Sequence, residues 1–108
     1  MIAIPFPPNF APKDFVEPGP VPSADLTWYF VGYGAFDGGP VRCYVFKAKG
    51  DGTPAVLVPI DKPTRGRGSL AVGGMGKGLW LLSYDGATLI QQPVPGWTPP
   101  PWMVKSPA

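Results

Sequence analysis

Leu26-Thr-Trp-Tyr-Phe-Val-Gly-Tyr33 is the stretch that decides the fold of this chain of 108 residues. It is rich in aromatic and β-branched residues, which favour strands. Because side chains alternate across a strand, one face carries Leu26, Trp28 and Phe30 and the other carries Tyr29, Val31 and Tyr33. Both faces are apolar, so the sequence predicts a strand that is covered on both sides.

Further strands are predicted on the C-terminal side of this stretch, separated by glycine-rich turns. Pro59 makes one of them an edge strand or ends it. The pair Asp85-Gly86 predicts a tight hairpin, and no segment has the pattern of a helix. We therefore expect an all-β fold, a small antiparallel sandwich or barrel of five to six short strands. The expected strands beyond the first are 41–47, 55–60, 70–72, 79–84 and 87–91.

Proline divides the chain into three parts. Of the 17 prolines, seven lie in residues 1–22 and six in residues 93–108, whereas 13 of the 15 glycines lie between. Proline fixes φ and biases the preceding residue toward extended backbone. The sequence thus predicts an extended proline-rich arm over 1–24, a β core over 25–92 and a second extended arm over 93–108.

The predicted core is small for independent stability. About 70 residues give a marginal hydrophobic core. Cys43 is the single cysteine, so no disulfide within the chain adds to it, and its apolar neighbours indicate a buried thiol. Oligomerisation or docking on a larger body is the expected extra source of stability. We predict a homo-oligomer, with a trimer as the guess for its symmetry.

Catalytic and metal-binding chemistry has little support in the composition. The chain has no histidine, which removes the commonest general base, and one cysteine alone does not make an ordinary zinc site. Asp37, Asp51 and Asp85 each precede glycine, the pairing typical of turns. We predict no catalytic residue, no metal site and no cofactor, and expect that the protein is not an enzyme.

Two glycine-rich stretches resemble nucleotide-binding loops only superficially. Gly73-Gly-Met-Gly-Lys-Gly78 has glycine where a phosphate loop needs Ser or Thr after the lysine, and no helix follows it. Gly66-Arg-Gly-Ser-Leu-Ala71 precedes a strand rather than a helix. The neighbouring loop carries Lys62, Arg65 and Arg67, a possible contact for a polyanion, although a net charge of +2 argues against nucleic acid as a partner.

The start of the chain lacks the basic and apolar regions of a signal peptide, and no apolar run is long enough for a membrane span. We therefore expect a protein made in the cytoplasm that does not use a membrane.

The arms are the expected partner-binding segments because they are unusually apolar for linkers. Pro5-Phe-Pro-Pro8 has the spacing of a polyproline ligand, but neither arm contains a tyrosine beside its prolines. Stiff arms lose little entropy on docking, and their aromatic side chains supply buried area. The residues expected to bind a partner are Phe6, Phe10, Phe15, Trp97, Trp102 and Met103.

In organisation, a compact β core with extended arms, the chain resembles the small accessory proteins of tailed bacteriophage virions, such as capsid decoration or cement proteins. The resemblance implies a non-enzymatic structural protein of a virion, made in the host cytoplasm, that cements capsid or similar assembly subunits through its arms. The alternative is a soluble β-rich adaptor that binds a partner protein or a glycan through Trp28, Tyr29 and Tyr33.

Overall fold

The computed structural model describes residues 4–13 and 19–104. These residues are mostly β, with antiparallel sheets and no helix of seven or more residues. The elements in chain order are β1 (Phe10–Pro12), β2 (Val21–Pro22), β3 (Trp28–Phe36), β4 (Arg42–Ala48), β5 (Val56–Val58), β6 (Gly68–Gly73), the 3₁₀ turn η1 (Gly74–Gly76), β7 (Gly78–Asp85), β8 (Thr88–Pro93) and the 3₁₀ turn η2 (Pro101–Met103).

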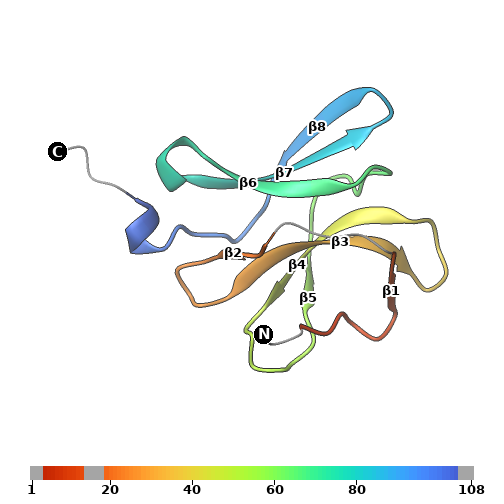
Figure 1. Cartoon of the computed structure of the whole chain (residues 1–108), viewed down its shortest axis with the longest axis horizontal. Coiled ribbons are helices and arrows are strands. Elements are labelled where there is room, and N and C mark those ends of the chain that lie inside the picture. The colour runs from red at the N-terminus through yellow and green to blue at the C-terminus, as the bar shows by residue number, and fades with distance from the viewer. Residues whose placement is uncertain (1–3, 14–18, 105–108) are drawn as a thin grey trace.

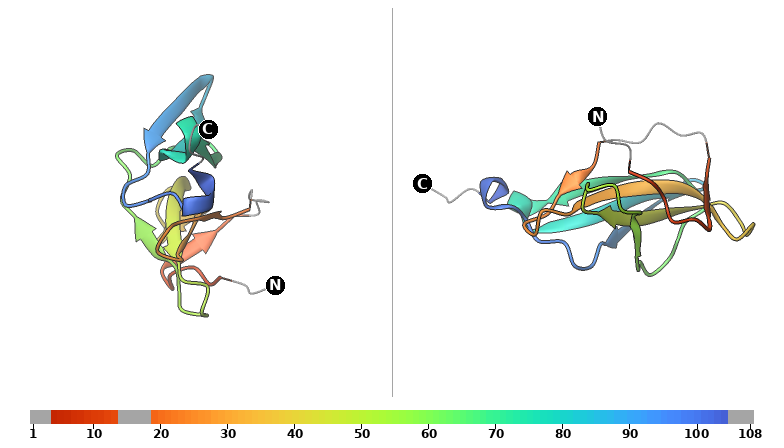
Figure 2. Two further views of the ribbon diagram at one scale, coloured as in Figure 1. Left: turned by 90° about the vertical axis from the view of Figure 1, so that its left-hand side faces the viewer. Right: turned by 90° about the horizontal axis from the view of Figure 1, so that it is seen from below.

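The strands form two antiparallel sheets (Figure 1). Sheet A has the order β1-β3-β4-β5, and β2 pairs with β3 beside β1. Sheet B has the order β6-β7-β8. The strands β3, β6 and β7 run along the longest axis of the molecule (Figure 2).

The strand predicted over Leu26–Tyr33 is present as β3, but it begins two residues later than predicted. β3 starts at Trp28, because Leu26 adopts a left-handed φ of 69° in the turn that joins β2 to β3. The alternation within β3 is as expected. Tyr29 and Val31 face sheet B, and Phe30 faces the other side of sheet A.

The main core lies between the two sheets. Sheet A contributes Tyr29, Val31, Cys43, Val45 and Val58, and sheet B and the segment after it contribute Leu79, Leu81, Val94 and Trp97. Cys43 is fully buried there, as predicted. Burying these side chains supplies most of the hydrophobic stabilisation of the fold.

The segment before β1 covers the opposite face of sheet A. Phe10, Phe30 and Phe46 are buried in a phenylalanine cluster, with Phe6 and Phe36 packed against it. The ring centroids of Phe6 and Phe10 lie 4.9 Å apart, as do those of Phe10 and Phe46, within the range of favourable aromatic pairs. This packing explains why β3 and β4 are apolar on both faces.

Residues predicted as arms therefore belong in part to the folded unit. β1 pairs with the end of β3, Phe10 opposite Phe36, and β2 pairs with its beginning, Val21 opposite Tyr29. The Ala55 N–H also donates to the Pro5 carbonyl at 2.8 Å. After β8, Val94 and Trp97 enter the main core. The described residues of both predicted arms therefore contact the core and do not extend away from it.

The six strands β3–β8 lie where five or six were predicted, with ends shifted by up to three residues. The β7–β8 turn is displaced by one residue, because Asp85 pairs with Thr88 and the loop residues are Gly86 and Ala87. Gly86 takes a positive φ of 66°, which suits glycine at the first loop position.

Candidate functional site

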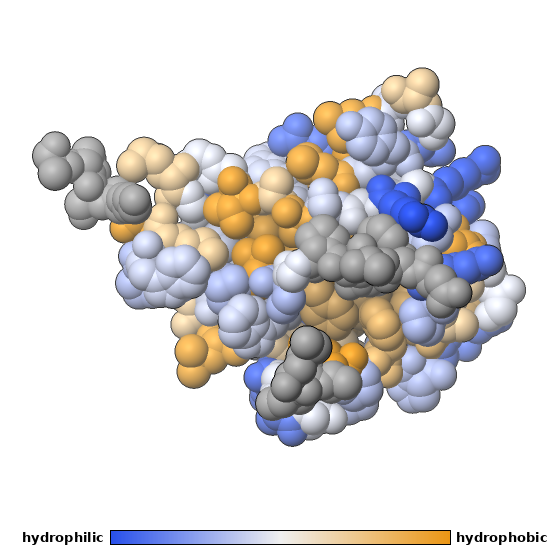
Figure 3. All heavy atoms as spheres, in the orientation of Figure 1, coloured by the Kyte–Doolittle hydropathy of each residue, from blue (hydrophilic) through white to orange (hydrophobic). Residues whose placement is uncertain are grey.

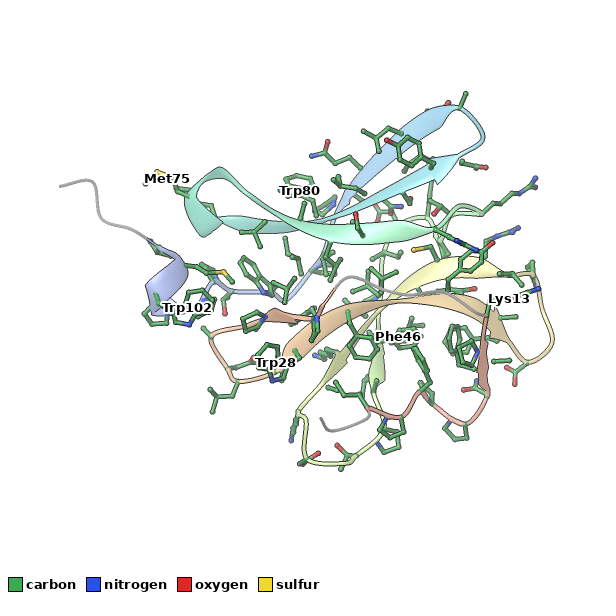
Figure 4. The ribbon with its side chains drawn as sticks, viewed as in Figure 1. Lys13, Trp28, Phe46, Met75, Trp80 and Trp102 are labelled. Atoms are coloured by element: carbon green, nitrogen blue, oxygen red, sulfur yellow. The ribbon has the colours of Figure 1, made fainter. Side chains whose placement is uncertain are left out.

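Three segments distant in sequence meet at one end of the molecule. They are the β2–β3 turn, the η1 loop and the C-terminal segment through η2, all at the left of Figure 1. They present Leu26, Trp28, Met75, Trp102 and Val104, all exposed large apolar side chains. We call this set the apolar end. Figure 4 shows Trp28, Met75 and Trp102 at this end and Lys13 at the opposite one.

The β2–β3 turn holds Leu26 outward. The Asp25 Oδ1 accepts the backbone N–H of Thr27 at 3.2 Å and its hydroxyl at 2.6 Å. The Leu26 N–H donates to the Ser23 carbonyl at 3.1 Å, closing the turn. Leu26 is left with a φ of 69° and an exposed fraction of 82%. Left-handed backbone is uncommon for a leucine, so this turn holds a large apolar side chain outward in an unusual conformation.

The same hydrogen bonds set the ionisation of Asp25. The Thr27 hydroxyl, followed by its backbone N–H, holds the pKa of the Asp25 carboxyl below its usual 3.8. Burial raises the pKa of the Tyr29 hydroxyl, and the Asp25 charge adds to that effect. The turn therefore carries a fixed negative charge at neutral pH.

The C-terminal segment is fastened to that turn. The Ala24 N–H donates to the Thr98 carbonyl at 2.9 Å. The Ser23 hydroxyl also donates to that carbonyl, at 3.2 Å, and accepts the Thr98 N–H at 3.3 Å. The Trp97 indole N–H donates to the Pro22 carbonyl at 2.8 Å. These bonds fix the path into η2, where Trp102 is 68% exposed.

The η1 loop completes the apolar end. Met75 has a φ of 55° and is 57% exposed, so it is a second apolar residue held outward in left-handed backbone. Gly76 lies against η2: a Cβ on it would come within 2.9 Å of the Met103 carbonyl oxygen. Glycine at this position thus lets η1 and η2 pack together.

A groove of about 450 Å³ runs between the β2–β3 turn and η2. Its lining is almost wholly apolar: Pro22, Ser23, Ala24, Leu26, Thr27, Trp28, Pro100, Pro101 and Trp102. Asp25 and Lys77 are exposed on the turns that border the apolar end. An apolar centre with charged groups at the margin is the usual anatomy of a protein-binding surface.

The residues predicted to bind a partner are distributed differently by the structure. Phe6 and Phe10 pack in the phenylalanine cluster, and Trp97 is in the main core, because the chain's own sheets receive them. Met103 is partly buried against the main core. Trp102 alone of this set lies exposed at the apolar end, and Phe15 lies outside the described residues.

The aromatic residues of the adaptor hypothesis also separate. Tyr29 is buried in the main core, Tyr33 is half-buried, and Trp28 is exposed beside the groove. Leu26 and Met75 were not recognised as site residues from the sequence. The Asp25-x-Thr27 turn pattern and the glycines on either side of Met75 were the available signals.

Lys62, Arg65 and Arg67 are exposed on the connection between the two sheets. The Arg65 carbonyl accepts the Tyr33 hydroxyl at 3.3 Å, and the Arg67 guanidinium lies 6.0 Å from the centre of the Tyr33 ring. Figure 3 shows hydrophilic side chains gathered toward the end opposite η2 and an apolar area near β2 and β6. On this face the apolar area and most of the hydrophilic side chains thus lie toward different ends.

No group of three or more potential metal ligands occurs within residues 4–13 and 19–104. Asp51, like Asp25, occupies a turn, in which it accepts the Thr53 hydroxyl at 2.6 Å. No helix in the described part of the chain is both long and apolar enough to cross a bilayer.

Comparisons with protein-family models, with curated proteins and with solved structures give no match to this chain.

Proposed function

We propose that this protein is a non-enzymatic structural component of a large protein assembly and that it docks through its apolar end. The observation that carries the proposal is the convergence of Leu26, Met75 and Trp102, three largely exposed apolar residues on three separate segments. Exposed apolar clusters bordered by polar groups mark interaction surfaces. The two facing sheets act as a small β-sandwich platform that positions them.

Trp102 and Trp28 are the expected anchors of the interaction. Tryptophan is enriched among residues that dominate binding energy, and such residues lie in the centre of an interface. Both indoles line the groove, into which an apolar side chain of the partner would fit. The hydrogen bonds to Thr98 and Pro22 hold the groove in shape before binding, which lowers the entropic cost of association.

The assembly to which we assign the protein is a tailed-bacteriophage virion, with a capsid protein as the partner. The support is the resemblance in organisation described above. Only part of the predicted arms binds the partner in this proposal. The segment 97–104 supplies Trp102, whereas Phe6 and Phe10 stabilise the platform.

Co-sedimentation of the purified full chain with assembled shells of the phage that encodes it tests this function. We expect the chain to pellet with the shells, and Trp102→Ala or Leu26→Asp to weaken binding by about 2 kcal/mol, on the order of 30-fold. Val56→Asp is the matched control, because Val56 is 58% exposed on β5 and lies outside the apolar end. It should bind as the unmodified chain does.

Two results would count against the proposal. An unmodified chain that stays in the supernatant removes the virion assignment. Shell binding that survives both Trp102→Ala and Leu26→Asp removes the apolar end as the docking surface. Binding to a glycan array that depends on Trp28 would favour the adaptor alternative instead.

A further inference from the structure

The outer face of sheet B, which points away from sheet A, has no charged residue. Leu79, Leu81 and Ser83 of β7 are buried toward sheet A, so Trp80, Leu82 and Tyr84 point outward by alternation. With their cross-strand partners, the outward positions are Ser69, Ala71, Gly73, Gly78, Trp80, Leu82, Tyr84, Leu89, Gln91 and Pro93. A sheet face that meets water normally alternates to polar residues, and this one does not.

The outer face is low at the end that carries Gly73 and Gly78 and raised at the end that carries Tyr84 and Leu89. Ideal Cβ atoms on Gly73 and Gly78 would lie 2.9 and 3.4 Å from the Trp80 Nε1, so the indole lies close over two residues that have no side chain. Figure 4 shows Trp80 on the side of sheet B away from sheet A. At the other end Tyr84 pairs with Leu89, and these side chains are 59% and 50% exposed.

A second copy of the chain fits this surface. On β7, Trp80 and Tyr84 lie two residues on either side of Leu82. A twofold axis that crosses the strands at Leu82 therefore places the raised end of one copy over the low end of the other. Ser69 and Gln91 pair with Leu82 across the sheet, so they lie on the same axis. Such self-complementarity is what an isologous dimer requires.

Charge and area both bear on the choice of partner. Two uncharged faces bury no unpaired charge when they meet, which avoids the main cost of a mismatched interface. Three strands, each paired with its neighbour over six residues, give a footprint of about 14 by 20 Å. Two such footprints amount to about 560 Å², to which the side chains standing above the strands add, so the pair belongs among the small, weak interfaces.

We propose that two copies of this protein pack outer face to outer face of sheet B as a weak, concentration-dependent dimer. This inference goes beyond the docking function, because the outer face and the apolar end share no residue. A dimer would carry two apolar ends, the arrangement that a protein linking neighbouring subunits needs.

Sedimentation velocity of the full chain alone, from about 2 to 500 μM, tests the dimer without any shell. We expect the sedimentation coefficient to rise from the monomer value with concentration. Tyr84→Lys should weaken the dimer at least tenfold, because it places an unpaired charge against the uncharged face of the partner copy. Val56→Lys, at a similarly exposed site on sheet A, should leave the dimer unchanged. A chain that stays monomeric throughout, or a Tyr84→Lys variant that dimerises normally, overturns the inference.

A crosslink tests the position of the twofold axis. Gln91 is exposed and lies on the axis, whereas the native Cys43 is buried. Gln91→Cys should form a disulfide-linked dimer under mild oxidation, seen on a non-reducing gel, and Val56→Cys should not. Equal crosslinking of both variants contradicts the proposed arrangement. Failure of shell binding would leave both dimer tests intact, so the two proposals can fail separately.

Discussion

At the scale of single residues, Gly66 shows how closely two segments approach. A Cβ on Gly66 would lie 1.4 Å from the Tyr84 carbonyl oxygen, a distance that no side-chain rearrangement relieves. The connection between the sheets can therefore pass β7 here only if residue 66 has no side chain.

Gly66→Ala should destabilise the protein by about 1–3 kcal/mol or more, because the backbone must move to admit the methyl group. Gly19→Ala is the matched control, since a Cβ there has no atom within 4 Å. It should be neutral or stabilise by up to about 1 kcal/mol through the unfolded chain. Urea unfolding followed by circular dichroism measures both. Equal effects of the two substitutions would show that the close approach does not constrain the fold.

Asp25 gives a pH dependence whose sign follows from its depressed pKa. The folded pKa lies below the unfolded value of about 3.8, so the stabilisation is present above that value and is lost as pH falls through the folded pKa. Asp25→Ala should be less stable than the unmodified chain at pH 6, and the difference should narrow toward pH 2.5. Urea unfolding at several pH values measures this difference. A difference that stays constant with pH would mean that the charged form of Asp25 does not hold the turn.

At the scale of elements, β1 and the segment before it behave as part of sheet A. Phe10 is 6% exposed and contacts the rings of Phe6, Phe36, Tyr44 and Phe46. Removing this segment would uncover one face of β3 and β4. A truncation of residues 1–22 would therefore test folding as well as partner binding.

Phe10→Ala should cost about 3–5 kcal/mol of stability, because it leaves a cavity among packed rings. Trp102→Ala should change stability by about 0.5 kcal/mol or less, since Trp102 is 68% exposed. Thermal unfolding of the two variants makes the comparison. A Phe10→Ala protein as stable as the unmodified chain would mean that the N-terminal segment does not contribute to the stability of the fold.

At the scale of the whole molecule, β3 and β4 are shared by both apolar clusters. One face of each strand lies in the main core and the other in the phenylalanine cluster. The connection after β5 ties the sheets together: the Cys43 N–H donates to the Thr64 carbonyl at 2.8 Å, and the Thr64 hydroxyl bonds the Ser83 hydroxyl at 2.8 Å. The surfaces outside these clusters include the apolar end and the outer face of sheet B.

Much of the local structure was determined by the sequence alone. Strand positions, the alternation of β3, the buried Cys43 and the hairpin near Gly86 follow from side-chain periodicity and turn chemistry, which act over a few residues. Both faces of the strand from Trp28 onward are apolar. The sequence alone therefore also predicted that each face is covered by other residues.

Which residues provide those covers was decided only by the tertiary structure. Proline content predicts extended backbone over residues 1–22, but an extended segment can pair with its own sheet or with another molecule. Here β3 has an open edge that receives β1 and β2, so Phe10 turns inward. The apolar end depends on contacts such as Ser23 with Thr98, 75 residues apart, and sequence periodicity carries no signal over that distance.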